Sequence, residues 1–168
     1  MVNLKSALPA MILSFIIYIV YTGSIGPYDL LTGAVVAVIV GLLAGEIVVS
    51  DPDKALDPKR LYWLIKYTIW YFLIAEVKAH ADVIKRALSP RIPLNPAIIR
   101  VPYYIKTDYA MTTIANSITN TPGTVVVDID YDHKVFYVHW IDAKTSDPEE
   151  ARKMISLQFE EYAREIFD

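Results

Sequence analysis

Two long apolar segments open the chain, the first running from about Ala7 to Thr22 and the second from about Leu30 to Val49. At 1.5 Å per residue the second segment makes a helix of about 30 Å, the thickness of a hydrocarbon core, and the first makes one of about 24 Å. The connector at residues 23–29 has no Lys or Arg, whereas residues 50–60 have three. The pattern predicts a helical hairpin with both ends in the cytoplasm. A cleaved signal peptide is the alternative for the first segment, but the second follows so closely that a hairpin is favoured.

A third helix is predicted between Asp57-Pro58, a typical helix start, and Ser89-Pro90, a typical helix end. Its first half is aromatic and its second half is charged. The apolar stretch over residues 61–75 contains Lys66 and is short for a membrane span. We therefore expect a helix that lies at the membrane interface, and a third span stays open as the alternative.

After residue 91 the polar and apolar positions alternate over shorter elements, as in a small α+β domain. We expect a strand over residues 98–105, a helix over 108–118, paired strands over 125–129 and 135–141, and a closing helix capped by Asp147. The apolar residues of the closing helix share one face, which predicts packing on the sheet: Ala151, Ile155, Phe159, Tyr162 and Ile166. The predicted order of the domain is β-α-β-β-α.

The expected fold is thus a membrane α-helical hairpin followed by the small α+β domain. The hairpin has two transmembrane helices, and the number rises to three if the middle helix also spans the membrane. The parts of this fold are the hairpin at residues 1–50, an interfacial or third membrane helix at 51–90, and a cytoplasmic domain at 91–168. A domain of about 75 residues has a small core. We therefore expect it to be supported by membrane lipid or by partner proteins.

The segment Thr121-Pro122-Gly123-Thr124 joins the predicted helix to the paired strands. Proline at the second position and glycine at the third are typical of a type II turn, which needs a positive φ at the glycine. The turn should therefore fix where the helix ends and the first of the paired strands begins.

Composition narrows the function classes. The chain has 54% apolar residues, a net charge of −3 and no cysteine. A negative net charge without a basic stripe argues against nucleic-acid binding. The lack of cysteine excludes iron–sulfur clusters, disulfides and thiol catalysis, so we expect no cofactor of that kind.

Few polar side chains are candidates for metal binding or catalysis. Asp128–Asp132 resembles the start of a calcium loop, but His133 and His139 occupy the positions where glycine and glutamate are needed. The three histidines do not share metal-ligand spacing, and no nucleophile or nucleotide motif is present. We therefore predict no metal, no cofactor and no catalytic residue.

Three charged residues near the membrane segments are candidates for a functional role: Glu46, Lys66 and Glu76. Ionisable groups inside a membrane are costly and often mark ion pathways, whereas lysine can also extend its charge to the interface. Glu46 is the strongest candidate because its stem is short. The small residues Gly33, Gly41 and Gly45 suit close packing with neighbouring membrane helices.

Several blocks resemble the E-type subunit of the multisubunit Mrp/Mnh cation/proton antiporters. They are Asn95–Pro102, Lys106–Asp108, Ala115–Thr119, Thr121–Thr124 and Tyr137–Asp142. The resemblance covers essentially the whole chain. A similar subunit belongs to the membrane modules of archaeal membrane-bound hydrogenases and related sulfur-reducing complexes.

The resemblance implies an accessory, non-catalytic subunit of a plasma-membrane complex that exchanges Na⁺ for H⁺. The implied partners are other membrane subunits and, in the redox-driven complexes, hydrogenase or other redox subunits. Thr121, Pro122, Gly123 and His139 are the implied residues for assembly or conformation, and Asn120 departs from the apolar residue common at its position. The alternative is a membrane-anchored module that recruits a cytoplasmic partner.

Overall fold

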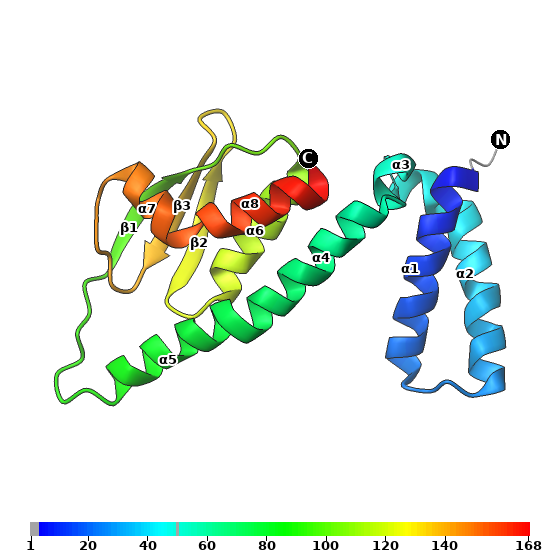
Figure 1. The fold of residues 1–168 in the computed structure, drawn as a ribbon, viewed down its shortest axis with the longest axis horizontal. Coiled ribbons are helices and arrows are strands. Elements are labelled where there is room, and N and C mark those ends of the chain that lie inside the picture. Colours follow the sequence, from blue (N-terminus) through cyan, green and yellow to red (C-terminus); the bar gives the residue numbers. More distant parts are fainter. Residues whose placement is uncertain (1–3, 50) are drawn as a thin grey trace. The chain divides into compact units, whose positions relative to one another are not determined.

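The computed structural model describes residues 4–49 and 51–168, and the chain forms two compact units, Met1–Pro58 and Lys59–Asp168 (Figure 1). The first unit is the predicted hairpin. Helix α1 (Leu4–Thr22) and helix α2 (Pro27–Val48) run side by side, and the short α3 (Pro52–Ala55) follows. By length and composition, α1 and α2 can each cross a membrane, and most of their apolar side chains are exposed.

Close packing holds the hairpin together through small residues on α2. Gly33, Gly41 and Gly45 are buried against α1. A Cβ atom at Gly45 would lie 2.8 Å from the Cα of Ala7, a separation that real side chains do not reach. The helix that packs closely on these glycines is therefore the chain's own α1.

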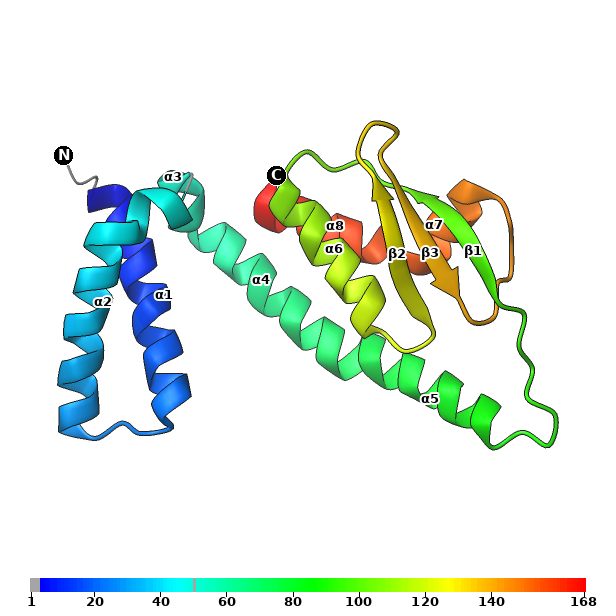
Figure 2. The same cartoon turned by 180° about the vertical axis from the view of Figure 1, so that it is seen from behind.

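The second unit begins with one long helical segment along its side (Figure 2). Helix α4 (Pro58–Trp70) continues through a π-helical turn, η1 (Tyr71–Ala75), into helix α5 (Glu76–Ala87). The amide of Glu76 donates to the carbonyl of Tyr71, five residues earlier. Such a turn inserts one residue into the helix and shifts the side chains that follow. It keeps Tyr67, Tyr71, Ala75 and Ala79, which recur every four residues, on the side of the helix that packs on the unit.

Three antiparallel strands form the sheet, in the order β1-β3-β2: β1 (Ala97–Pro102), β2 (Thr124–Asp130) and β3 (Val135–Trp140). Helix α6 (Asp108–Asn120) connects β1 to β2, and a bulge interrupts β2 between Val126 and Asp128. The core lies on one face of the sheet, where Phe136 and Val138 of the central strand have no exposed surface. The expected α+β domain with an antiparallel sheet is confirmed.

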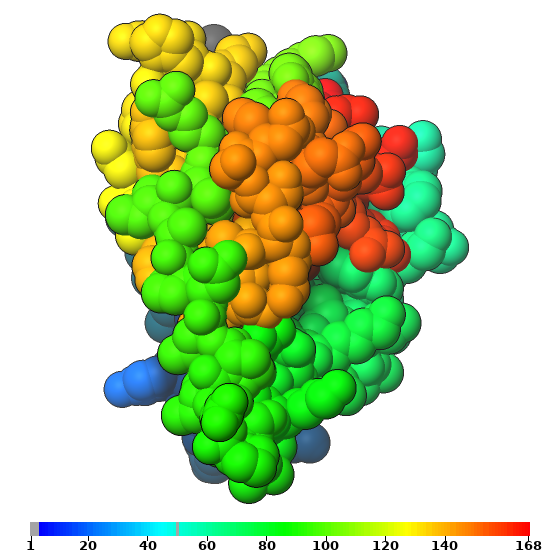
Figure 3. All heavy atoms as spheres, turned by 90° about the vertical axis from the view of Figure 1, so that its left-hand side faces the viewer, coloured from blue at the N-terminus to red at the C-terminus, as the bar shows by residue number. Residues whose placement is uncertain are grey.

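The closing helix and the first strand differ from the prediction. One closing helix was expected, but the structure has α7 (Pro148–Ile155) and α8 (Leu157–Phe167), separated at the fully buried Ser156. Helix α7 packs on β1 and lies at the surface in Figure 3, whereas α8 packs on α6, so one straight helix cannot follow both. The first strand ends at Pro102 and not at residue 105, because the chain leaves the sheet there to reach α6.

Candidate functional site

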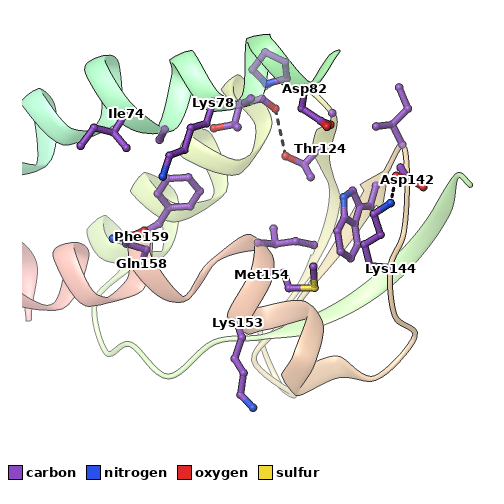
Figure 4. A pocket seen from close by; sticks show the side chains of 18 of the residues that line it. Ile74, Lys78, Asp82, Thr124, Asp142, Lys144, Lys153, Met154, Gln158 and Phe159 are labelled. Atoms are coloured by element: carbon purple, nitrogen blue, oxygen red, sulfur yellow. Dashed lines mark hydrogen bonds and ion pairs between the residues drawn. The ribbon is translucent and has the colours of Figure 1, made fainter. Parts of the chain in front are cut away.

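A groove of about 450 Å³ opens on the second unit around the turn at residues 121–124 (Figure 4). We call it the 121–124 groove. One wall comes from η1 and α5, the opposite wall from the end of α7 and the start of α8, and the end of β3 closes it. The apolar part of this lining is aromatic and aliphatic, and its larger residues are Trp70, Ile74, Trp140, Ile155 and Phe159.

The turn has the predicted geometry. Gly123 has a φ of 102°, and the amide of Thr124 donates to the carbonyl of Thr121 over 3.4 Å. The hydroxyl of Thr121 donates to the carbonyl of Ser117 over 2.7 Å, and that of Thr124 donates to the carbonyl of Ile118 over 2.8 Å. These two bonds satisfy carbonyls at the end of α6, so the threonines fasten the turn to the helix.

Charged residues ring one end of the groove. The guanidinium of Arg86 on α5 donates to Asp82 over 2.7 Å and to Asp142 over 2.5 Å. Asp142 follows β3 and also accepts a hydrogen bond from Lys144. Lys144 and Arg86 hold the pKa of Asp142 below its usual range, and burial acts against them. The network ties α5 to the exit of the central strand and leaves the aspartate ionised at neutral pH.

The groove as a whole favours a ligand with a largely apolar surface, because most of the charges around it are paired with one another. Its walls carry four cations, Lys78, Arg86, Lys144 and Lys153, and two aspartates, Asp82 and Asp142. In Figure 4 Lys78 extends over the groove toward Phe159, and Lys153 points away from it. Within residues 4–49 and 51–168, no group of three or more His, Asp or Glu side chains could hold a metal ion. The arrangement is suited to docking a segment of another molecule.

A partly buried polar cluster lies where α4 and η1 meet α6. The hydroxyl of Tyr71 accepts a hydrogen bond from the side-chain amide of Asn120 over 2.9 Å, and Tyr67 shares a hydrogen bond with Ser117. Burial raises the pKa of Tyr67 to about 12, and burial together with the nearby Glu76 carboxylate raises the pKa of Tyr71. Both tyrosines therefore stay neutral and act as hydrogen-bonding groups between the helices.

The predicted site residues do not gather at one place. Thr121, Pro122 and Gly123 line the groove. His139 alternates with the buried Phe136 and Val138 along β3, so it belongs to the other face of the sheet, between Ile98 and Val125 on the neighbouring strands. The sequence prediction grouped these four residues, and the structure separates the histidine from the other three.

The charged candidates also occupy separate places. Glu46 is exposed in the last turn of α2. The ammonium of Lys66 lies 4.3 Å from the centre of the Trp63 ring, a cation–π distance. Glu76 begins α5, and its Oε1 is the buried side-chain polar atom, among the described residues, that lacks a hydrogen-bond partner.

Sequence reasoning missed the role of Arg86 in the groove and the partner of Asn120 in the cluster beside it. Arg86 looks like one member of an exposed charged run, and only the fold shows that it meets Asp142. Asn120 was noted as unusual, and the structure gives its partner as Tyr71. The available signal was Asp142, a charged residue that directly follows an apolar strand.

A change of Gly123 to alanine is expected to cost about 1–2 kcal/mol of stability, because an L side chain is strained at a positive φ. Its Cβ would also lie 3.3 Å from the Cγ2 of Ile141. Pro122→Ala is the matched control, since it keeps the turn and is expected to cost about 0.4–1 kcal/mol through the unfolded state. Denaturation followed by tryptophan fluorescence measures both, and an equal cost for the two variants would contradict the argument.

The comparisons with known proteins agree with the architecture. The family model described as "Na+/H+ ion antiporter subunit" matches residues 11–166. The E-type Na(+)/H(+) antiporter subunit of Alkalihalophilus pseudofirmus is 30% identical over 153 residues, which cover 91% of this chain and 90% of that protein. The E1-type Na(+)/H(+) antiporter subunit of Staphylococcus haemolyticus is 35% identical over 107 residues, covering 64% of this chain and 65% of that protein.

A solved structure is similar along nearly the entire chain. It is a chain of the membrane-bound sulfane sulfur reductase, an archaeal respiratory membrane complex, with a TM-score of 0.83 and 35% identity. The match covers 98% of this chain and 100% of that one. With a match to the family model over residues 11–166 and this likeness in structure, the chain belongs to the MNHE family of Na⁺/H⁺ ion antiporter subunits, which are membrane proteins.

Proposed function

We propose that the chain is an accessory, non-catalytic subunit of a multisubunit membrane complex that exchanges Na⁺ for H⁺. The observation that carries the proposal is the likeness, over nearly its whole length, to one chain of a solved respiratory membrane complex. The relatives named as E-type antiporter subunits supply the class of transport. Other membrane subunits of an antiporter-type complex are therefore the proposed partners.

The two units divide this role. The hairpin anchors the chain in the plasma membrane, and its exposed apolar side chains face lipid or neighbouring membrane helices. The cations that follow α2 favour a cytoplasmic α+β domain by the positive-inside rule. There the 121–124 groove offers an apolar lining with a charged rim to a neighbouring subunit. Thr121, Pro122 and Gly123 would set its shape, and His139 would serve assembly on the open face of the sheet.

Glu46 is the residue proposed to take part in the ion path. Its carboxylate is on the last turn of α2, and ionisable side chains within membrane segments often mark ion pathways. Glu46→Gln should reduce Na⁺/H⁺ exchange by the assembled complex and leave its subunit composition unchanged. Lys66 and Glu76 are weaker candidates, because Lys66 contacts Trp63 and Glu76 lies 3.3 Å from His80 on α5.

Gentle purification through a tag on this chain, followed by mass spectrometry, tests the proposal. We expect large multi-helix antiporter-like subunits in stoichiometric amounts. Iron–sulfur and nickel–iron proteins in the same preparation would identify a redox-driven complex, and their absence from an active preparation would identify a secondary antiporter. Exchange measured in everted vesicles, with and without this chain, shows whether transport depends on it.

The groove also favours a second function, a membrane-anchored module that recruits a cytoplasmic protein. Its mixed apolar and charged lining would suit such a partner as well as it suits a fixed subunit. The same purification separates the two functions. Recovery of the chain as a stable species without membrane partners would overturn the subunit proposal and support recruitment.

A further inference from the structure

The outer face of α4 and η1 is apolar and exposed over its whole length. Six large side chains form it, and each is more than half exposed: Leu61, Tyr62, Ile65, Ile69, Phe72 and Leu73. Their spacing of three and four residues places them along one side of the helix. Figure 2 shows that no other element of the second unit covers this side. A contiguous apolar face of this kind marks an interaction surface.

The opposite side of the same helix makes the contacts that pack this helix on the rest of the unit. Trp70 stacks on Tyr162 of α8 with 5.2 Å between ring centres, and it meets Phe159 edge to face at 5.7 Å. Tyr67 is buried beside the same rings, 5.4 Å from that of Tyr162. The outer side chains are therefore not needed for packing within the unit. A helix that is apolar on both sides is typical of one covered on both sides.

Charge along the helix follows a pattern that suits a lipid headgroup layer. Residues 61–75 contain no Asp or Glu. Four exposed lysines recur along one flank: Lys59, Lys66, Lys78 and Lys85. Lys78 extends over the 121–124 groove and Lys59 lies 3.7 Å from Glu165 of α8, and both are long side chains that can turn toward a headgroup layer. Lys59 and Lys66 are seven positions apart, about two helical turns, and so are Lys78 and Lys85. Lys66 and Lys78 are twelve positions apart, about three turns plus the extra residue of the π turn. A row of lysines beside an apolar stripe lets the ammonium groups reach lipid phosphates while the stripe enters the acyl boundary.

We propose that this outer face lies directly on the lipid surface of the membrane, as an in-plane interfacial helix. The inference deepens the proposed function and rests on the hairpin crossing that membrane. Nine residues separate the end of α2 from the start of α4, so the chain enters α4 within reach of the headgroups. The lysine flank favours lipid, and not another membrane helix, as the partner of the outer face. Anionic lipid headgroups attract a row of cations, whereas the apolar surface of a membrane helix does not.

The absence of native cysteine allows a direct test on the full chain. Single cysteines at Ile65, Ile69 and Phe72 would carry nitroxide labels on the outer face, and Tyr131, exposed in the β2–β3 turn, supplies the control. The labelled chain would be reconstituted into vesicles of phosphatidylcholine and phosphatidylglycerol. Collision with oxygen, which enters lipid, is then compared with collision with a water-soluble nickel chelate. Circular dichroism confirms that each variant folds.

We expect the oxygen-to-nickel collision ratio to be several-fold higher at all three outer positions than at Tyr131. Vesicles of phosphatidylcholine alone should lower the ratio at the outer positions, since the lysines lose their anionic partners. Outer labels that collide with nickel as freely as Tyr131 would overturn the proposal. So would labels shielded from both reagents in the purified complex, because a protein then covers the face. These results do not depend on which subunits co-purify, so failure here is distinguishable from failure of the antiporter role.

Discussion

Replacing Glu160 with alanine is expected to destabilise the α+β unit by about 3–5 kcal/mol, because it leaves a buried charge network without its acceptor. The Glu160 side chain is 1% exposed. It accepts hydrogen bonds from Arg152 on α7 over 2.9 Å and from Arg164 on α8 over 2.8 Å. The backbone amide of Tyr104 donates to it over 3.2 Å. One carboxylate thus holds the two closing helices and the chain after β1 together.

The cost arises from the partners that remain. Arg152 is 14% exposed at its side chain, and without Glu160 it keeps only the half-exposed Glu149 at 3.5 Å, so much of its charge stays desolvated. Arg164 is 50% exposed, and Arg164→Ala is the control, expected to cost about 1 kcal/mol or less. All three tryptophans, Trp63, Trp70 and Trp140, lie in this unit, so urea unfolding of the full chain in detergent can be followed by their fluorescence. Equal costs for the two variants would contradict the proposed role of Glu160.

The burial of this carboxylate also shows what the sequence pattern of a helix does not predict. The five apolar residues of the closing helix predict its buried face, and the structure buries or partly buries all of them. The cap at Asp147 is confirmed too, since the amide of Glu150 donates to the Asp147 carboxylate over 2.9 Å. Glu160 and Ser156 look like ordinary surface positions in a helical pattern. Their burial follows from the two directions that α7 and α8 take, and those directions depend on β1 and α6, which are distant in sequence.

The candidate site divides in the same way. The turn at residues 121–124 could be predicted because proline and glycine constrain the backbone locally. The groove around it could not, since its walls come from η1, α5, α7 and α8, and the π turn that directs Ala79 toward it has no local signal. Strand alternation alone separates His139 from Val138, but which face is covered depends on where the helices pack.

Valine at both Gly41 and Gly45 is expected to separate the membrane helices and destabilise the hairpin by several kcal/mol. Overpacking costs about 1–3 kcal/mol at each position. A Cβ at Gly41 would lie 2.8 Å from the carbonyl oxygen of Ala7, and one at Gly45 would lie 2.8 Å from the Cα of Ala7. Both contacts are with backbone, which cannot rotate away as a side chain can. Because both glycines meet Ala7, the two costs are coupled and need not add.

The change in helix separation can be measured directly. Nitroxide labels on cysteines at Leu4 and Ile47, both strongly exposed near the end of the hairpin where Gly45 packs, report the distance between α1 and α2 by pulsed electron resonance. The double variant should lengthen that distance by about 1–2 Å and broaden its distribution, since interhelical distance follows the side chains at the contact. Leu43→Val, a valine on an exposed position of the same helix, should leave it unchanged. An unaltered distance in the glycine variant would mean that α1 is not the surface these glycines serve. Their close packing would then have to be sought with a helix of another subunit.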